Sequence, residues 1–582
     1  MADRRRRWVA KLAVKAQQDF PDGAKRTENR HNNSLTDRML TGGCVMKWKR
    51  GWMTMLGFGM LMMLPLQVLA QSGLGPVTRV RPIELIVQSA GANPTEFETA
   101  QMIAAEWRKL GLEVTVNGMD WARIGEKVFQ QYDYDAAVVR YSGRAERIDP
   151  YHFIYQILHS KGRSNEVGYR SAEYDKYADL QNELTDVQKR QVAVFRAQEI
   201  SAREQPLTPI VNRNQIHVYN HQTFEGYQVF TGEGLNVFWN YMGLRPKTAR
   251  KTVRMAYAQD NETLNPTNMF QFRDFQVAQL IYDRLVRIDL AGVPQEWAAE
   301  SIKVVNPTTY RVKLRSGMTF HDGKPVTAED VKFSVELFRE IKGSRLWGLA
   351  QPAQELRVLD GLTVEFLLKE PFAPFVANTL GQLFILPKHI WSKIPLKDVP
   401  SYADPKPIGS GPFKVEYWQR DRELKLARHD NHFSKPAVDG IIRVVFPTVD
   451  GIVGALERGE VDFTGWWLEP AEAARLRAVA HLKAIEVPNH GFLAVDYNNR
   501  RDPFKHAAFR RALAYAVPKQ RILDLLLEKH GSLAFSTVGP ENKFWHNPNL
   551  EKVNYDLGKA RQILLDAGFR FDGSGRLHVP KQ

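Results

Sequence analysis

Residues 296–341 read EWAAESIKVVNPTTYRVKLRSGMTFHDGKPVTAEDVKFSVELFREI. In Tyr310–Leu314, apolar side chains alternate with basic ones, which is the period-two pattern of a strand with one buried face. The turn residues of His321–Pro325 follow, and Thr327 can then cap a helix, with Asp330 in the position of a capping box. The apolar face of that helix is formed by Val331, Val335 and Phe338. The stretch therefore predicts a strand, a turn and a helix that share one side to bury.

The same stretch resembles the signature of the extracytoplasmic solute-binding protein family 5 of ABC importers, the dipeptide-, oligopeptide- and nickel-binding group. The segments that carry the resemblance are FHDG at 320–323 and TAEDVKFS at 327–334. The resemblance implies an α/β fold of the two-lobed periplasmic binding protein type II, with an extra accessory domain. It also implies a binding protein rather than an enzyme.

Composition agrees with an exported protein and argues against a nucleic-acid partner. The chain has 582 residues, 43% of them hydrophobic, and a formal net charge of +15. Residues 1–50 alone carry a net charge of +8, so the basic excess is mostly a property of this leader rather than of a folded basic face. Cys44 is the single cysteine, which excludes an intrachain disulfide and is compatible with the periplasm.

The leader divides into two parts. Residues 1–45 are polar and Arg-rich without periodicity, and we interpret them as disordered or as an over-extended gene start. Residues 46–70 combine the basic KWKR segment, an uncharged apolar run and a small-residue ending, the pattern of a secretory signal peptide with cleavage near Ala70. An uncleaved membrane anchor is the alternative, because twenty uncharged residues could span a bilayer. Either interpretation favours a periplasmic location.

The remaining segments resemble the family in a rotated order. QMIAAEWRKLGLEVTV at 101–116 resembles the C-terminal third of the family, whereas KTVRMAYA at 251–258 resembles its mature N-terminus. FRRALAYAVPKQRIL at 509–523 then follows in the family order. We interpret this as a circular permutation, with residues 244–252 as the linker between the old termini, since termini of domains lie at the surface and often close together. The alternative is a fusion of two gene fragments or a mis-assembled reading frame.

This interpretation assigns lobes to the chain. Lobe 2 comprises 81–213 and 488–582, lobe 1 comprises 214–288 and 409–487, and the accessory domain comprises 289–408. Within 81–213, the order strand, helix, strand, helix, strand predicts a largely parallel sheet. Two further helices are expected at 172–183 and 186–203, before a strand that begins near Pro206.

Motifs for catalysis or metal binding are not evident. The sequence has no nucleophile elbow, no phosphate-binding loop and no dinucleotide fingerprint. His429 and His432 could be imagined as metal ligands, but they lie in a family loop where polar turn residues are expected. We therefore expect no catalytic residues, no metal site and no cofactor. The resemblance leaves a metal chelate open as the solute, because the family includes binders of nickel complexes.

A binding protein instead needs a cleft with aromatic walls and a few fixed polar groups. Four stretches that follow predicted strands or turns, or that occupy matching family positions, are candidates. The ligand-binding residues that they supply are Tyr141, Ser142, Gly143 and Arg144, Asn265 and Asn268, Trp466 and Trp467, and Tyr497 and Asn498. Two adjacent tryptophans cannot both face the core, so we expect one of Trp466 and Trp467 to be structural and the other to face the cleft.

Arg144 departs from the family pattern. Peptide binders resemble W-x-G-D at this point, where the aspartate pairs with the α-amino group of the ligand. A guanidinium cannot hold an ammonium group but pairs well with carboxylate or phosphate. We therefore hypothesise an anionic or polyhydroxylated solute. The alternative is that Arg144 faces solvent or pairs with Glu146, and that Asp149 takes the amine.

These observations predict the periplasmic solute-binding component of an ABC importer, for a peptide-like or other small polar solute. Its expected partners are the permease and ATPase subunits at the inner membrane, and we expect a monomer. A non-transport receptor that feeds a sensor, and a hydrolase, are the alternatives. The identity of the solute cannot be predicted, because pocket residues vary within one fold.

Overall fold

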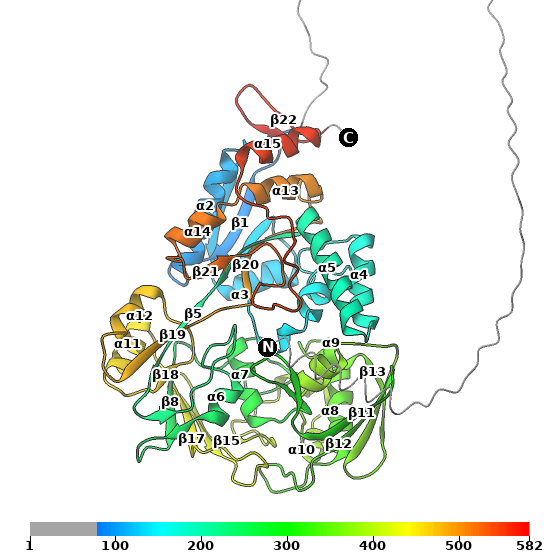
Figure 1. The fold of residues 1–582 in the computed structure, drawn as a ribbon, viewed down its shortest axis with the longest axis vertical. Coiled ribbons are helices and arrows are strands. Elements are labelled where there is room, and N and C mark those ends of the chain that lie inside the picture. The colour runs from blue at the N-terminus through cyan, green and yellow to red at the C-terminus, as the bar shows by residue number, and fades with distance from the viewer. Residues whose placement is uncertain (1–77, 581–582) are drawn as a thin grey trace, which may run out of the picture.

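The computed structural model describes residues 78–580. The leader, the proposed signal peptide and Cys44 lie outside the described residues. The described chain forms three bodies, each built on a sheet of four or more strands (Figure 1). We call the bodies lobe 2, lobe 1 and the accessory domain, as defined by their sheets below.

Lobe 2 contains a six-stranded sheet with the order β2-β1-β3-β20-β4-β21. Its strands are β1 Ile83–Gln88, β2 Val114–Met119, β3 Ala136–Tyr141, β4 Leu207–Arg213, β20 Phe492–Tyr497 and β21 Gly531–Leu533. The strand β20, from the C-terminal part of the chain, lies between β3 and β4 from the N-terminal part. Residues more than 350 positions apart therefore share one sheet, and Figure 1 shows the blue and orange segments side by side.

The prediction of a largely parallel sheet is correct only for its first three strands. β1 pairs in parallel with both β2 and β3, as the strand–helix–strand order predicts. β20, however, runs antiparallel to β3 and to β4. It enters lobe 2 from lobe 1 rather than through a crossover helix, so nothing constrains it to the direction of its neighbours.

Helices cover the sheet of lobe 2. They are α2 Pro94–Arg108, α3 Trp121–Ile124, α4 Ala172–Glu183, α5 Val187–Glu204, α13 Ala507–Tyr515, α14 Lys519–Leu525 and α15 Leu557–Asp566, with π-helical segments at Gly125–Gln130 and His152–Gln156 and a 3-10 helix at Ala145–Ile148. The positions of α4 and α5 confirm the two predicted helices. α2 begins after Asn93, whose side chain caps it, and its buried Trp107 donates from Nε1 to the carbonyl oxygen of Leu513 at 3.2 Å.

Lobe 1 contains a seven-stranded sheet with the order β15-β16-β17-β8-β18-β5-β19. Its strands are β5 Gln215–Asn220, β8 Thr252–Tyr257, β15 Phe413–Gln419, β16 Glu423–Arg428, β17 Gly440–Val445, β18 Phe463–Thr464 and β19 Leu482–Val487. Its helices are α6 Phe238–Gly243, α7 Phe272–Ile281, α11 Val449–Glu457 and α12 Pro470–Leu476. A two-stranded ribbon of β6 Phe224–Glu225 and β7 Arg245–Pro246 precedes β8.

The accessory domain contains a four-stranded antiparallel sheet with the order β11-β12-β14-β13. Its elements are β11 Ala299–Asn306, β12 Thr309–Leu314, α8 Ala328–Glu340, α9 Trp347–Ala350, β13 Ala353–Val358, β14 Thr363–Leu368 and α10 Lys388–Trp391. The strand, turn and helix predicted from 296–341 are all present, and Thr327 and Asp330 form the expected capping box at α8. Val331, Val335 and Phe338 are buried, which confirms the predicted face of this helix.

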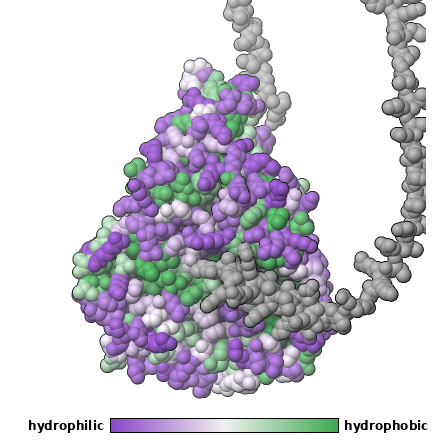
Figure 2. Space-filling model, in the orientation of Figure 1, coloured by the Kyte–Doolittle hydropathy of each residue, from purple (hydrophilic) through white to green (hydrophobic). Residues whose placement is uncertain are grey.

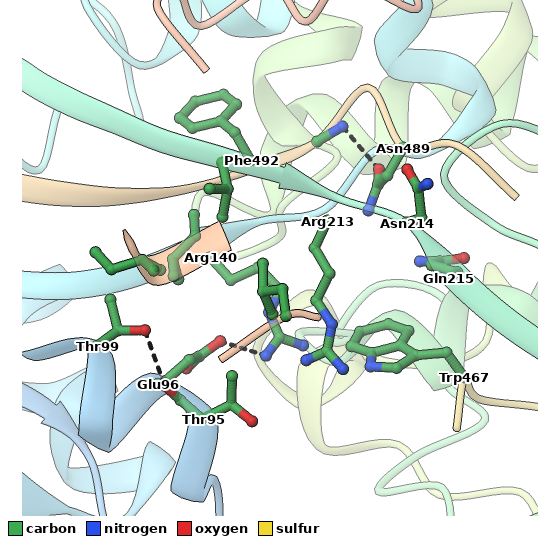
Figure 3. Close-up of a pocket in the computed structure, with 15 residues that line it drawn as sticks. Thr95, Glu96, Thr99, Arg140, Arg213, Asn214, Gln215, Trp467, Asn489 and Phe492 are labelled. Carbon is green, nitrogen blue, oxygen red and sulfur yellow. Dashed lines mark hydrogen bonds and ion pairs between the residues drawn. The ribbon is translucent and has the colours of Figure 1, made fainter. Parts of the chain in front are cut away.

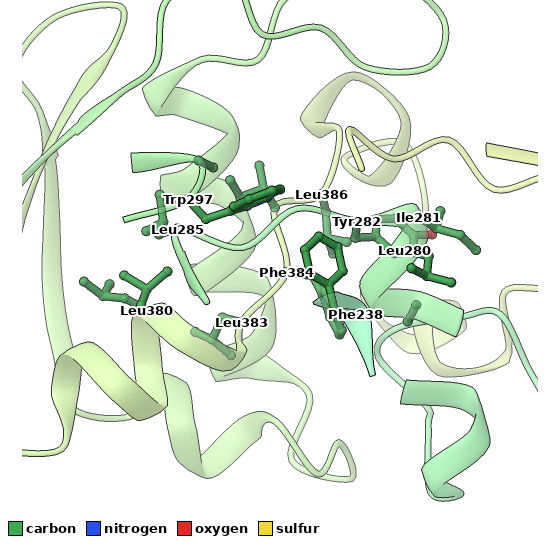
Figure 4. Close-up of a cluster of buried hydrophobic side chains, with 14 of the residues drawn as sticks. Phe238, Leu280, Ile281, Tyr282, Leu285, Trp297, Leu380, Leu383, Phe384 and Leu386 are labelled. Carbon is green, nitrogen blue, oxygen red and sulfur yellow. The ribbon is translucent and has the colours of Figure 1, made fainter. Parts of the chain in front are cut away.

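The accessory domain packs on lobe 1 through one continuous core. Figure 4 shows Phe238 and Tyr282 of lobe 1 in the same cluster as Trp297, Leu383 and Phe384. Trp297 contacts Phe238 edge-on, with ring centroids 5.2 Å apart, and donates from Nε1 to Asp283 at 2.8 Å. Lobe 1 and the accessory domain are therefore joined by buried apolar surface together with buried hydrogen bonds.

Two short segments connect lobe 2 to lobe 1. Asn214 separates β4 from β5, and residues 488–491 separate β19 from β20. We call these two segments the hinge, because hinges are a few residues at element ends where two bodies meet.

The two ends of the described chain lie next to each other at the far end of lobe 2. Val80 donates from its backbone N–H to Leu577 at 2.9 Å, and Val579 donates to Thr78 at 2.9 Å. The visible surface is mostly hydrophilic, with smaller apolar patches (Figure 2). Across residues 78–580, no helix combines the length and the apolar character needed to cross a bilayer.

Candidate functional site

A cavity of about 860 Å³ lies between lobe 2, lobe 1 and the accessory domain. This volume falls within the usual range of small-molecule sites. Residues of all three bodies line it, and aromatic side chains form much of its wall. Those side chains are Trp121 and Phe129 of lobe 2 and Phe270, Phe272, Phe275 and Trp466 of lobe 1.

A second, much smaller pocket of about 30 Å³ lies at the hinge. Figure 3 shows the Trp467 ring beside the guanidinium groups of Arg140 and Arg213, which lie 4.8 Å and 6.0 Å from the ring centroid. Arg140 also forms an ion pair with Glu96, and Arg213 forms one with Glu469 of lobe 1. Trp467 therefore contacts lobe 2 through cation–π interactions at the hinge.

The two adjacent tryptophans divide their roles between these pockets. Trp466 lines the large cavity and Trp467 lines the hinge pocket. Their rings stack at 3.9 Å with an interplanar angle of 28°. The pair thus couples one wall of the cavity to the contact between the lobes.

Tyr141, Ser142 and Arg144 also line the large cavity, from the end of β3 and the loop that follows. The hydroxyl group of Tyr141 donates to Asp496 Oδ2 at 2.8 Å. Burial raises the pKa of both groups, that of Asp496 to about 7. Asp496 belongs to β20, so this hydrogen bond joins the two distant parts of lobe 2.

Gly143 lies between those residues but is buried against the hinge. An added Cβ atom would lie 2.4 Å from Asn489 Oδ1 and 2.5 Å from the backbone nitrogen of Gly491. Gly143 therefore permits close approach of two backbone segments, and it does not line the cavity.

Four other residues from the sequence prediction lie outside the cavity. The fully buried Tyr497 shares a hydrogen bond of 2.8 Å with Thr208, and Asn498 donates to the carbonyl oxygens of Tyr132 and Tyr134 at 2.9 and 3.0 Å. Asn265 donates to the carbonyl oxygens of Val399 and Tyr402 at 2.7 and 3.0 Å, and Asn268 is exposed. For Asn265 and Asn498 the structure departs from the expectation because their buried amides donate to loop carbonyls instead of turning toward the cavity.

Arg144 reaches across from lobe 2 to lobe 1. Its guanidinium lies 4.8 Å from the ring centroid of Phe275, and burial lowers its pKa. The pairing of Arg144 with Glu146 is not observed, and the role of Asp149 toward a ligand amine stays a prediction. Glu146 pairs with Arg284 at 2.5 Å, and both carboxylate oxygens of Asp149 accept from Arg190 at 2.8 Å.

Sequence reasoning missed several charged residues of the cavity. Arg147 lies in the same loop as Arg144, and Arg345 comes from the segment between α8 and α9 of the accessory domain. Glu166 of lobe 2 and Asp260 of lobe 1 also line the cavity. Their residue types were visible in the sequence, but no local pattern indicated that three bodies would bring them together.

Metal ligands are not assembled in the described part of the chain. Residues 78–580 contain no group of three or more His, Cys, Asp or Glu side chains that could hold an ion. His432 lies 3.3 Å from Asp283, and His429 lies 3.2 Å from the carbonyl oxygen of Gly411. Burial lowers the pKa of His429, so both histidines are accounted for by structural contacts.

The lobes are in contact around the cavity. In addition to the ion pair between Glu146 and Arg284, the backbone nitrogen of Ala145 donates to Glu233 at 2.6 Å. On the accessory side, Ala373 donates to the carbonyl oxygen of Asn182 at 2.6 Å. Lobe 2 therefore contacts both lobe 1 and the accessory domain directly.

The family described as "Bacterial extracellular solute-binding proteins, family 5 Middle" matches residues 66–165 and 293–579. These segments cover more than half of the chain. The chain belongs to this family of extracellular solute-binding proteins.

Two of the similar proteins are an oligopeptide-binding protein and a dipeptide-binding protein. The oligopeptide-binding protein AppA of Bacillus subtilis is 29% identical over 303 residues, which are 50% of this chain and 55% of AppA. The dipeptide-binding protein of Escherichia coli is 27% identical over 316 residues, which are 50% of this chain and 58% of that protein. The chain thus spans little more than half the length of these curated relatives. A solved structure of AppA with a nonapeptide aligns with a TM-score of 0.49 and 26% identity, over 56% of this chain and 66% of AppA.

Proposed function

We propose that this chain is the solute-binding component of an ABC importer. It captures a peptide-like or other small polar solute between two lobes and delivers it to a membrane permease, without catalysis. The observation that carries the proposal is the 860 Å³ cavity lined by side chains of both lobes and the accessory domain. A solute that touches all three bodies stabilises the closed arrangement over an open one, which is the differential contact that a transport receptor needs.

The location and the partners follow from this role. Membership of an extracellular family supports a periplasmic protein that is exported through the signal peptide at 46–70. Its partners are the permease and the ATPase of the importer, and the protein acts as a monomer without a nucleic-acid partner.

Mass spectrometry of small molecules released from the purified full chain tests the proposed function. We expect a near-stoichiometric solute from the wild type and little or none from Ser142→Trp, because the indole would project from the loop after β3 into the cavity and obstruct a bound solute. Gly361→Trp is the matched control, since it adds the same side chain in an exposed turn with no atom within 4 Å of the new Cβ. Equal solute in all three proteins, or none in the wild type, would contradict the proposal.

We also propose that the chain is a circular permutation of its family. The hydrogen bonds between the ends of the described chain and the insertion of β20 between β3 and β4 support it. Joining residue 580 to residue 78 and opening the chain between 246 and 251 should then give a protein with an unchanged melting temperature. A chain rearranged in this way that fails to fold would contradict the permutation.

A further inference from the structure

Six arginines line the cavity, and they fall into two groups. Three have carboxylate partners: Arg140 pairs with Glu96, Arg273 with Glu262 at 2.9 Å, and Arg420 with Asp260 at 3.7 Å. The other three are Arg144, Arg147 and Arg345, and within residues 78–580 none of them forms an ion pair. The second group is therefore an excess of positive charge inside a partly enclosed space.

Arg144 and Arg147 lie together in the loop after β3. Arg147 donates from Nη1 to the carbonyl oxygen and to the hydroxyl group of Ser142, at 2.8 and 2.9 Å. The Nε atoms of both arginines are buried and have no hydrogen-bond partner among the described residues. Each guanidinium carries five N–H donors, and buried donors without acceptors are costly, so the two Nε–H groups lack an acceptor.

The acidic residues nearest to this pair do not supply that acceptor. Glu146 is held by Arg284, and Glu233 accepts from the backbone of Ala145 while burial raises its pKa to about 8. Glu166 lines the same cavity, and burial raises its pKa to about 8 as well. The charges of Arg345 and Arg147 act on Glu166 in the opposite direction to burial, but Glu166 forms no ion pair with either arginine among the described residues.

Arg345 adds a cation from the third body. Its side chain is exposed at the cavity, and its guanidinium lies 5.5 Å from the ring centroid of Phe270. Burial lowers the pKa of Arg147, and the positive charges of Arg144 and Arg345 lower it further. An anion between the three arginines would replace this mutual repulsion with attraction.

We propose that the cavity binds a solute that carries a carboxylate or phosphate group, held by Arg144 and Arg147 of lobe 2 and by Arg345 of the accessory domain. The aromatic wall formed by Phe272, Phe275 and Trp466 faces the body of the solute. Arginine suits this task because its planar fork matches the geometry of oxyanions. The inference rests on the proposed function and names the chemical class of its solute.

Acid and neutral forms of otherwise matched probes test the inference by calorimetric titration of the full chain. The probes are trialanine against trialanine amide, gluconate against glucose, and inorganic phosphate against chloride at equal ionic strength. We expect an acid probe to bind about tenfold or more tightly than its neutral or chloride counterpart, as charge-assisted hydrogen bonds predict. A preference within the trialanine or gluconate probes identifies a carboxylate as the bound group, and a preference for inorganic phosphate over chloride identifies a phosphate.

Three variants then assign the effect to the residues. Arg147→Gln and Arg345→Gln should each abolish the preference, and Arg345→Lys should restore part of it because a cation returns. Arg357→Gln is the charge-matched control, since Arg357 is an exposed residue of the accessory sheet paired with Glu355. An unchanged melting temperature of each variant excludes misfolding. Because Arg345 is more exposed than Arg147, Arg345→Gln still tests the site if Arg147→Gln does not fold.

The outcomes separate this inference from the proposed function. Equal binding of acid and neutral probes, binding of neutral probes alone, or no binding of any acid probe would overturn the oxyanion site. A neutral solute that co-purifies with the wild type and is absent from Ser142→Trp would also overturn it, yet it would leave the proposed function standing. The absence of any cavity-dependent solute would instead count against the function itself.

Discussion

The sheets of lobe 2 and of the accessory domain are assembled from the chain in opposite ways. The accessory sheet takes its four strands from one stretch, Ala299–Leu368, and each pair is antiparallel. The lobe 2 sheet takes strands from 83–213 and from 492–533, with β20 in an inner position. One sheet can therefore form from local contacts, whereas the other requires both ends of the chain before its core closes.

The largest effect should come from the contact between the two ends. Trp107 of α2 is fully buried and packs 6.2 Å from Tyr497 of β20, between ring centroids. We expect Trp107→Ala to lower the free energy of unfolding by about 3–5 kcal/mol. Hydrogen exchange should show that both parts of lobe 2 lose protection together.

Phe366→Ala is the matched variant in the accessory sheet, where Phe366 is equally buried. It should expose the amides of β11 to β14 and leave those of β20 protected. If Trp107→Ala loosened only α2 and its neighbours in the sequence, the shared core of lobe 2 would be contradicted.

A second test uses pH. Burial raises the pKa of Asp496 to about 7, so the folded state keeps a proton that the unfolded chain releases near pH 4. The stability of lobe 2 is then greatest below about pH 4 for this group, and it falls as the pH rises toward 7. Asp496→Asn should remove this fall, which amounts to roughly 3–4 kcal/mol.

Urea unfolding at pH 5 and pH 8 measures the effect. The wild type should lose stability between these values relative to Asp496→Asn, and Tyr141→Phe should enlarge the loss because it removes the donor to the carboxylate. Parallel pH profiles for the wild type and Asp496→Asn would contradict the assignment.

A smaller effect is expected at Asn498. Its amide donates to the carbonyl oxygens of Tyr132 and Tyr134, which again joins the two ends of the chain. Asn498→Ala should cost about 1–3 kcal/mol in chemical denaturation, because it leaves buried acceptors unsatisfied. Solute binding by the folded variant should be unchanged, since Asn498 does not line the cavity. A loss of binding without a loss of stability would show instead that Asn498 contributes to the binding site.

The smallest effect is expected on the surface of the accessory sheet. Arg357 and Glu355 form an exposed ion pair at 2.7 Å. Because exposed pairs contribute little, Arg357→Gln should leave the denaturation midpoint unchanged within error. A clear shift of the midpoint would show that this sheet depends on its surface charges.

The contrast between the two sheets also explains what the sequence could predict. The strand, turn and helix of 296–341, and the helices α4 and α5, depend on local periodicity and capping, so their positions were predictable. The antiparallel direction of β20 was not, because it depends on where a distant strand enters the sheet. Periodicity says nothing about which distant segments share a sheet, and the family resemblance supplied that information.

The residues of the cavity also differ in whether the sequence could locate them. Tyr141 ends β3, and Ser142, Arg144 and Trp466 follow strands that end at the cavity; strand ends can be located from the sequence. Whether a side chain at such an end turns outward, as at Arg144, or inward, as at Asn498, depends on carbonyls of remote loops. Arg345 escaped prediction because the accessory domain is placed by packing on lobe 1.

A disulfide test addresses the central claim, that the two ends of the chain form one lobe, most directly. Val138 of β3 and Val495 of β20 are register partners in the sheet and both are buried. In a Cys44→Ser background, Val138→Cys with Val495→Cys should form an intrachain disulfide, detected by intact mass and by mobility without reductant. Val138→Cys with Val364→Cys, which places the second thiol in the accessory sheet, should remain reduced. A reduced Val138–Val495 pair under the same oxidation would contradict the account.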